Sequence, residues 1–293
     1  IEEFESILIR IAPYMHQTVE KGRNRFGAEW EAEFDKTLEI IFSGDPERLE
    51  KAVKGYVRFA LDATKLQKQF EKKRVYPSKT FEEAAQKVYH NRNYMKDIYL
   101  PGILLSHYLW PHHYSQLQYF KNRFAPLITA SRDCRFCDVG VGTGFYSRQA
   151  LSISPDITGK AYDISAHSID YAKMHLSRFD LQDRWEYENR NIITDMPSET
   201  WPFLISVEIL EHLEYPQSFL RGLRKLLKDD GYGFITAAIT APNSDHIYLY
   251  NTHEEVAEQL RETGFSIIEY QEDMAYEPKN DEPVPRLVAF IVQ

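Results

Sequence analysis

Hydrophobic and polar positions follow two different patterns on either side of Arg132. Before Arg132, apolar residues recur every three or four positions, which is the spacing of amphipathic helices. After it, short apolar runs of strand length alternate with amphipathic stretches. The helices expected in the first part cover 28–42, 45–73, 78–89, 92–110 and 111–124. The strands expected in the second part cover 135–139, 157–162, 185–189, 203–207, 233–239, 265–271 and 286–292.

Strands and helices alternate through the second part. The helices expected between the strands begin near Gly144, Ser165, Pro216 and Thr252. Such alternation is typical of an α/β fold, in which a parallel sheet carries helices on both faces. A loop joins the last two expected strands, which favours an antiparallel pair at the sheet edge. The sequence therefore predicts an α-helical domain over 1–130 and an α/β domain with a mostly parallel, seven-stranded sheet over 131–293.

Composition and charge narrow the choice of partners. The 293 residues are 43% hydrophobic and 27% charged, which suits a packed core, and no apolar run is long enough to cross a bilayer. Two Cys residues provide no disulfide framework and suit a reducing, cytoplasmic location. Residues 1–130 carry 20 Lys and Arg against 17 Asp and Glu, and residues 131–293 carry 15 against 27. The acidic second part argues against nucleic acid as a partner, while a homodimer is compatible with the sequence.

A glycine-rich loop follows the first expected strand and opens a helix. It reads Asp138-Val-Gly140-Val-Gly142-Thr-Gly144. Glycines at such a turn let the backbone bend sharply and approach a ligand, and the helix start adds free N–H groups. The third glycine comes one residue too early for a dinucleotide fingerprint, and no Lys-Ser or Lys-Thr pair follows to make a phosphate-binding loop.

The loop resembles the first motif of class I S-adenosylmethionine-dependent methyltransferases, which have a Rossmann-like fold. Asp163 ends the second strand, where a carboxylate can accept hydrogen bonds from both ribose hydroxyls. Asn191 follows the third strand, where this family often places a polar residue at the adenine amine. Turn formation and helix capping are the alternative roles for these side chains. The resemblance implies that the cofactor contacts Asp138, Gly140, Gly142, Gly144, Asp163, Ile164, Asn191, Ile192 and Glu208.

The fourth expected strand leads into an E-x-x-E-H sequence formed by Glu208, Glu211 and His212. On a helical turn this spacing places all three side chains on one face, which makes a natural site for a divalent cation. The sequence, with the later Asp245-His246, resembles two groups of O-methyltransferases: the ubiquinone-pathway enzymes and the metal-dependent small-RNA 2′-O-methyltransferases.

In the RNA enzymes the matching residues hold a magnesium ion, so the resemblance implies the metal ligands Glu208, Glu211, His212 and His246. The donor set also suits manganese, iron or zinc. In the alternative without metal, Glu208 contacts the cofactor, and His212 or His246 acts as a general base. The expected catalytic residues are His212, His246 and Glu211.

The helical part contains an aromatic stretch with a turn at Trp110-Pro-His112-His113. Core packing explains most aromatic residues at such spacing. In class I methyltransferases the segment before the first strand commonly covers the cofactor and completes the substrate pocket, which makes Tyr94, His112 and His113 candidates for substrate contact.

The sequence therefore predicts an S-adenosylmethionine-dependent methyltransferase acting on a small molecule. A metal-bound substrate with two oxygens favours O-methylation first, and C-methylation of an enolate close behind. RNA 2′-O-methylation and a non-catalytic cofactor-binding module are the alternatives.

Overall fold

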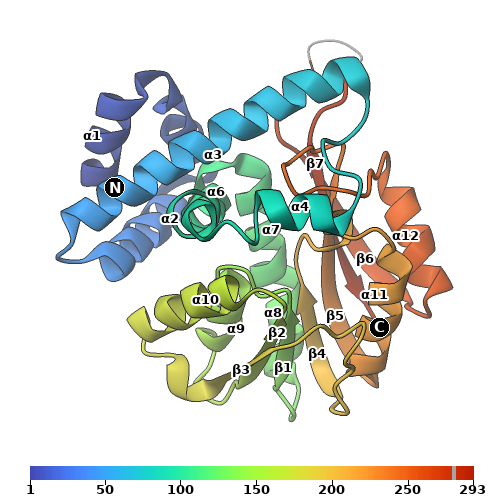
Figure 1. The fold of residues 1–293 in the computed structure, drawn as a ribbon. Coiled ribbons are helices and arrows are strands. Elements are labelled where there is room, and N and C mark those ends of the chain that lie inside the picture. The colour runs from blue at the N-terminus through green and yellow to red at the C-terminus, as the bar shows by residue number, and fades with distance from the viewer. Residues whose placement is uncertain (279–281) are drawn as a thin grey trace.

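The computed structural model describes residues 1–278 and 282–293 (Figure 1). Within them the strands form one seven-stranded sheet in the order β3-β2-β1-β4-β5-β7-β6. The strands are β1 (Phe136–Val139), β2 (Gly159–Asp163), β3 (Trp185–Asn189), β4 (Trp201–Ser206), β5 (Leu227–Ile239), β6 (Ile267–Met274) and β7 (Arg286–Val292). The pairs from β3 to β5 are parallel, whereas β7 is antiparallel to both β5 and β6. The predicted α/β class and mostly parallel sheet are confirmed.

Two strands begin earlier than the apolar pattern predicted. The first residues of β4 and β5 pair at Trp201 and Leu227, ahead of a register shift between Trp201 and Phe203. The polar run from Lys228 to Asp230 interrupts the apolar pattern of β5 there, so the pattern did not show this pairing. β6 lies nearer the C-terminus than predicted, because its half-exposed residues alternate only weakly between polar and apolar.

Helices make up the chain before β1 and connect most of the strands. The α-helices are α1 (Glu2–Ile11), α2 (Gln17–Phe42), α3 (Pro46–Lys73), α4 (Phe81–Lys87), α5 (Arg92–Tyr94), α6 (Leu100–Leu109), α7 (Pro111–Tyr119), α8 (Ala125–Ala130), α9 (Phe145–Leu151), α10 (Ala166–Arg178), α11 (Pro216–Leu226) and α12 (His253–Glu262). The predicted helix over 92–110 is interrupted by a π-helical turn, Met95–Tyr99. The helix predicted over 78–89 is shorter, because Thr80 rather than Ser78 caps it.

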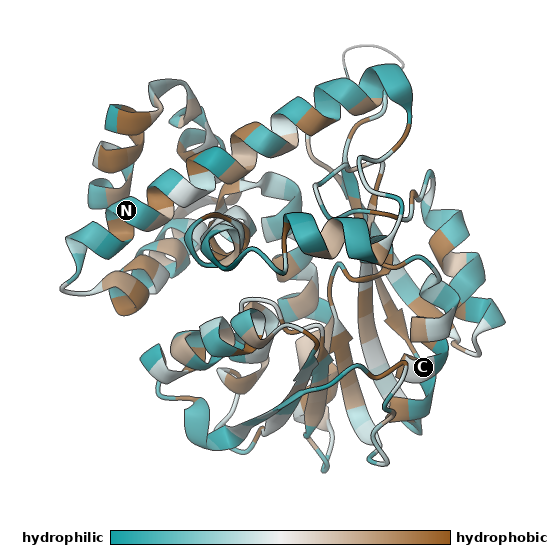
Figure 2. Cartoon of the chain, in the orientation of Figure 1, coloured by the Kyte–Doolittle hydropathy of each residue, from teal (hydrophilic) through white to brown (hydrophobic). Residues whose placement is uncertain are grey.

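Helices cover both faces of the sheet, as predicted, and successive strand residues show why. Phe136, Ile205 and Phe234 belong to the hydrophobic core that contains α6 to α10. Their strand neighbours Cys137, Leu204 and Ile235 point to the opposite face and join the core under α11 and α12. Figure 2 shows the resulting brown, apolar strands between helices with teal outer faces.

The helical part and the sheet share one core. A single cluster of buried side chains runs from Phe4 in α1 to Ile291 in β7, and Phe124 packs on Phe234 with ring centroids 5.5 Å apart. The division into domains at residue 130 therefore stays a prediction. In the described part of the chain, no helix combines the length and apolarity that a bilayer crossing requires.

The strand order reverses between β1 and β4, which lie side by side with Asp138 opposite Ile205. Parallel sheets bind ligands at the carboxyl ends of the strands beside such a reversal. The loops after β1 and β4 carry the glycine-rich sequence and the E-x-x-E-H sequence, so the fold brings the two predicted motifs together.

Candidate active site

A cavity of about 1370 Å³ lies between the carboxyl edge of the sheet and the helical part, with α3 along one side. This volume exceeds the usual size of a pocket for one small ligand, so it has room for a cofactor and a substrate together. The predicted site residues that line it are Asp138, Gly140, Gly142, Asp163, Ile164, Asn191, Ile192, Glu208, His212, His246, His112 and His113.

The three glycines of the loop serve different purposes, although all have positive φ. A Cβ on Gly140 would lie 2.3 Å from Ile209, and one on Gly144 would lie 2.9 Å from Ala172 of α10. Both residues therefore allow close packing. A Cβ on Gly142 would meet nothing within 4 Å among the described residues and would enter the cavity. Gly142 is the glycine that leaves room for a ligand.

Asp163 organises this loop from the end of β2. Its carboxylate accepts hydrogen bonds from the backbone N–H of Gly142 at 3.2 Å and of Ser165 at 2.7 Å. Burial raises the pKa of Asp163 to about 6 although these amides oppose the shift. The turn-forming role considered as an alternative is thus present, and the carboxylate also lines the cavity.

The other predicted cofactor contacts lie around the same end of the cavity. Ile164 is 49% exposed and Ile192 is buried, and both line the cavity as apolar surfaces. The side chain of Asn191 accepts a hydrogen bond from the N–H of Ile193 at 2.9 Å, so it shapes its own turn. Carboxylates and apolar surfaces suit a ligand that carries positive charge and an adenine ring, as S-adenosylmethionine does.

Asp138 leads to a prediction about pH. Ser147 donates a 2.7 Å hydrogen bond to its buried carboxyl, and burial raises the pKa of Asp138 to about 7. Because the folded-state pKa of this carboxyl is above its unfolded value, the protonated group stabilises the folded protein. This contribution is complete below the unfolded pKa and is lost as pH rises through the folded pKa. As pH rises from 4 to 8, deprotonation of Asp138 is expected to lower the free energy of unfolding by about 4 kcal/mol.

The measurement is urea unfolding of the ligand-free protein across this pH range. The variant Asp138→Asn is expected to show a flatter pH dependence than the wild type, because the amide does not titrate. The same pH dependence in both proteins would contradict the prediction.

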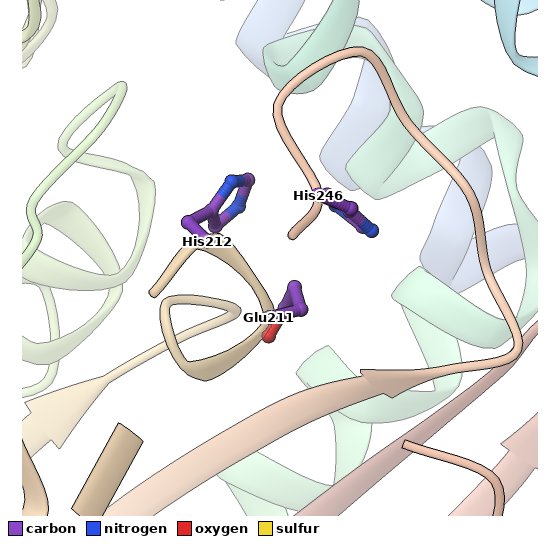
Figure 3. A group of neighbouring side chains, drawn as sticks. All are labelled: Glu211, His212 and His246. Carbon is purple, nitrogen blue, oxygen red and sulfur yellow. The ribbon is translucent and has the colours of Figure 1, made fainter. Parts of the chain in front are cut away.

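The second part of the site is formed by Glu211, His212 and His246 (Figure 3). Glu211 and His212 lie on the turn η5 (Leu210–His212) after β4, and His246 lies on the loop after β5. One ligand atom from each residue lies within 4.8 Å of the others. The carbonyl oxygen of Glu211 accepts hydrogen bonds from Ile247 N–H at 2.7 Å and Tyr248 N–H at 3.0 Å, which fixes the turn against the loop.

The Glu211 carboxylate has the properties of an ion ligand. The side chain is fully buried, and neither oxygen accepts a hydrogen bond within the residues that the structure describes. Burial raises the pKa of Glu211 to about 7. A buried carboxylate without hydrogen-bond donors is costly unless a cation pairs with it.

Both histidines are held by their Nδ1 atoms. His212 Nδ1 lies 3.2 Å from Asp245 Oδ2, and His246 Nδ1 donates to the carbonyl oxygen of Ala241 at 2.5 Å. Each imidazole therefore has Nε2 left to offer, and metal-binding histidines are usually held in this way by a carboxylate or a carbonyl group. Together with the unpaired Glu211 oxygens, these contacts fit a divalent cation.

The two imidazoles differ in charge. Burial lowers the pKa of His212, but the charge and hydrogen bond of Asp245 outweigh burial and raise it to about 9. Burial, with the nearby His212, lowers the pKa of His246 to about 3. At neutral pH without a cation, His212 is protonated and His246 is neutral, so His246 is the better placed of the two to accept a proton.

Glu208 departs from the predicted arrangement. The E-x-x-E-H spacing assumes an α-helical turn, but Glu208 has φ of 53°, and the turn after it is a short 3₁₀ helix. Among the described residues, the group of close ligand atoms does not include Glu208. Its Oε1 instead lies 3.9 Å from Nδ1 of His113, on the cavity wall. The expectation that Glu208, Glu211 and His212 share one face is therefore not met, and Glu211, His212 and His246 remain as the group of close ligand atoms. Contact with the cofactor stays the prediction for Glu208.

The aromatic stretch reaches the cavity through its histidines. His112 and His113 line it, and burial lowers the pKa of each, so both are neutral. Tyr94 is not among the described residues that line the cavity, and packs on Tyr99 with ring centroids 6.3 Å apart. His107, which the sequence did not single out, lines the cavity and stacks on Phe145 at 4.1 Å between ring centroids.

Sequence reasoning also missed Asp245, Tyr89 and Tyr99 as parts of the site. Asp245 is fully buried, and both tyrosine hydroxyls donate to its Oδ2. The Asp-His pair in the sequence was a signal for Asp245. Tyr99 belongs to the aromatic stretch but was not chosen from it, and no local signal marks Tyr89. Both tyrosines lie about 150 positions from Asp245 in the chain.

Comparisons with known proteins match the part of the chain that carries the glycine loop and the η5 turn. Residues 137–232 match a family model described as a methyltransferase domain. Mitochondrial ubiquinone biosynthesis O-methyltransferases of Candida albicans and Schizosaccharomyces pombe are 31% identical over 117 residues and 29% identical over 113 residues. The matches cover 39% and 37% of the chain but 34% and 40% of those relatives, so the chain aligns with less than half of their length.

A solved structure, that of a candidate sarcosine dimethylglycine methyltransferase from Galdieria sulphuraria, shares the fold. It aligns with 61% of this chain and 85% of that chain at a TM-score of 0.50 and 10% identity. The family match and the fold confirm the class that the motifs predicted. The chain contains a class I S-adenosylmethionine-dependent methyltransferase domain, and S-adenosylmethionine is the cofactor of that class.

Proposed function

We propose that the protein transfers a methyl group from S-adenosylmethionine to an oxygen of a small molecule that has two neighbouring oxygens, with help from a divalent cation. The main support is the buried Glu211 carboxylate, whose oxygens lack hydrogen-bond partners in the described structure, beside two imidazoles held by Nδ1. The curated relatives are O-methyltransferases of ubiquinone biosynthesis, which favours oxygen as the acceptor.

The reaction is a direct displacement. A lone pair of the acceptor oxygen forms the new C–O bond while the C–S bond breaks, and its electrons stay on sulfur, which gives neutral S-adenosylhomocysteine. The hydroxyl proton must leave the acceptor. A divalent cation held by Glu211, His212 and His246 would lower the pKa of a bound hydroxyl and hold both substrate oxygens.

The protein's own residues position the two reactants. The Gly142 backbone and Asp163 hold the donor at the carboxyl ends of β1 and β2, and the η5 turn places the acceptor beside it. Pre-positioning of this kind contributes a large part of the rate enhancement in transfer reactions. Residues 131–293 carry 15 Lys and Arg against 27 Asp and Glu, which disfavours binding of a phosphodiester backbone, so a small acceptor fits better than RNA.

The test is methylation of simple catechols, with matched monophenols and a short single-stranded RNA as comparison substrates. S-Adenosylhomocysteine formation is expected with catechols, and mass spectrometry with NMR should place the methyl group on oxygen. Excess EDTA is expected to reduce the rate at least about 100-fold, and an excess of Mg²⁺, Mn²⁺, Fe²⁺ or Zn²⁺ to restore it. A full rate in excess chelator would show that no cation takes part. A product methylated on carbon would show that oxygen is not the acceptor.

A further inference from the structure

Asp245 connects the helical part of the protein to the candidate metal site. Its side chain is fully buried on the loop after β5. Tyr89 Oη donates to Asp245 Oδ2 at 2.9 Å and Tyr99 Oη donates to the same oxygen at 2.5 Å. This oxygen also lies 3.2 Å from Nδ1 of His212. One carboxylate oxygen thus joins two tyrosines of the helical part to a ligand on the loop after β4.

The same stretch of the helical part, residues 76–99, holds both loops at other points. We name it the strap. The Ser78 hydroxyl donates to the carbonyl oxygen of Ser244 at 2.8 Å, and Ala241 N–H donates to the Tyr76 hydroxyl at 3.1 Å. On the other loop, the N–H of Phe81 donates to Glu214 Oε1 at 2.7 Å. The ring of Tyr76 also lies edge-on to that of His246, with centroids 5.7 Å apart.

These contacts fix the tautomer and the orientation of the His212 imidazole. The carboxylate and the carbonyl oxygen of Asp245 and the hydroxyl oxygen of Tyr89 all lie 3.2 Å from Nδ1, so they select the tautomer with hydrogen on Nδ1 and leave Nε2 for a ligand. Partners of this kind orient a metal-binding imidazole and increase its basicity. The tyrosine hydroxyls in turn hold the carboxylate in place, because a buried carboxylate without donors would be unstable.

We propose that Asp245 is the positioning residue of the cation site, and that Tyr89 and Tyr99 set its position, so that the affinity for the cation depends on the docking of the strap. This inference rests on the proposed function for the existence of the cation site. It assigns roles to three residues that do not belong to the group of close ligand atoms. It also gives the helical part a function at the site besides covering the substrate.

The test is direct measurement of Mn²⁺ affinity, by electron paramagnetic resonance of the free ion, on the full chain. Tyr89→Phe and Tyr99→Phe are each expected to weaken Mn²⁺ binding several-fold, and Asp245→Asn by about 10- to 100-fold. Affinity for S-adenosylhomocysteine, measured by calorimetry, is expected to stay within about twofold, because the hydrogen bonds of these three side chains in the described structure run to one another and to His212 rather than to the glycine loop. The control is Tyr119→Phe, a buried tyrosine that packs on Phe234 away from the site.

A double variant distinguishes positioning from general loss of structure. If Tyr99 acts through Asp245, Tyr99→Phe is expected to add little to the effect of Asp245→Asn, whereas independent effects would multiply. If Asp245→Asn does not fold, the two tyrosine variants still decide the matter. Wild-type Mn²⁺ affinity in both tyrosine variants would overturn this inference and leave the proposed function intact. Absence of Mn²⁺ binding by the wild type would overturn both.

Discussion

Replacing Glu211 with Gln is expected to reduce methyl transfer at least about 100-fold and to remove its response to added metal. The amide keeps the size of the side chain but loses the anionic charge, and Glu211 is the member of the three-residue group that supplies that charge. Affinity for S-adenosylhomocysteine is expected to stay within about twofold of the wild-type value, because Glu211 is not among the described residues that line the cavity.

Stability gives an independent reading of the same variant. The wild-type carboxyl is buried without a hydrogen-bond partner in the described structure, which costs free energy when it is ionised. Removal of the charge is therefore expected to leave the melting temperature of the metal-free protein equal or higher. A variant that is inactive only because it unfolds would show a lower melting temperature.

The measurements are initial rates with and without chelator, calorimetry with S-adenosylhomocysteine, and thermal unfolding. The control is Glu262→Gln, an exposed residue at the end of α12, which should behave like the wild type in all three. Full, metal-responsive turnover in Glu211→Gln would show that the carboxylate is not needed, and would remove the main support for a cation at this site.

The two motifs could be predicted from the sequence because each is local and each follows a buried strand. The glycine loop keeps its spacing after β1, and Glu211 and His212 are neighbours after β4. Parallel strands bring these loops to one edge of the sheet whatever the details of packing. The adjacency of the two motifs therefore followed from the strand order alone.

The failure at Glu208 has a local cause. Spacing of i, i+3 and i+4 gives one face only if the whole stretch is α-helical. Glu208 adopts a left-handed conformation with φ of 53°, and the turn that follows is 3₁₀. Non-glycine residues rarely adopt this conformation, so a spacing argument could not anticipate that Glu208 would diverge from Glu211.

The contacts of the helical part could not be predicted because they depend on tertiary packing. Tyr89 and Tyr99 meet Asp245 across about half of the chain. The π-helical turn at Met95–Tyr99 shifts the register of the helix just before Tyr99, and nothing in the apolar pattern marks it. Which aromatic residues face the site is therefore a result of the fold.

Replacing Gly142 with Ala is expected to weaken S-adenosylhomocysteine binding at least about tenfold, and with Val at least about 100-fold. Gly142 has φ of 52°, and a Cβ there would meet no described protein atom within 4 Å. The new methyl group would therefore enter the space left for the cofactor rather than the core. Strain at positive φ is expected to cost about 1–2 kcal/mol of stability in the Ala variant, and more with the β-branched Val.

Gly27 provides a control for strain at positive φ away from the cavity. It has φ of 71° and ψ of −156°, a Cβ there also meets nothing within 4 Å in the described structure, and it lies in the break of α2 and is not among the lining residues of the cavity. Residues with a Cβ rarely adopt this conformation, so Gly27→Ala is expected to lose at least as much stability while it keeps full cofactor affinity. Calorimetry and urea unfolding of both variants separate the two effects. If Gly142→Ala bound S-adenosylhomocysteine as tightly as Gly27→Ala, the cofactor could not lie against the glycine loop, and the placement of the donor beside Asp163 would be wrong.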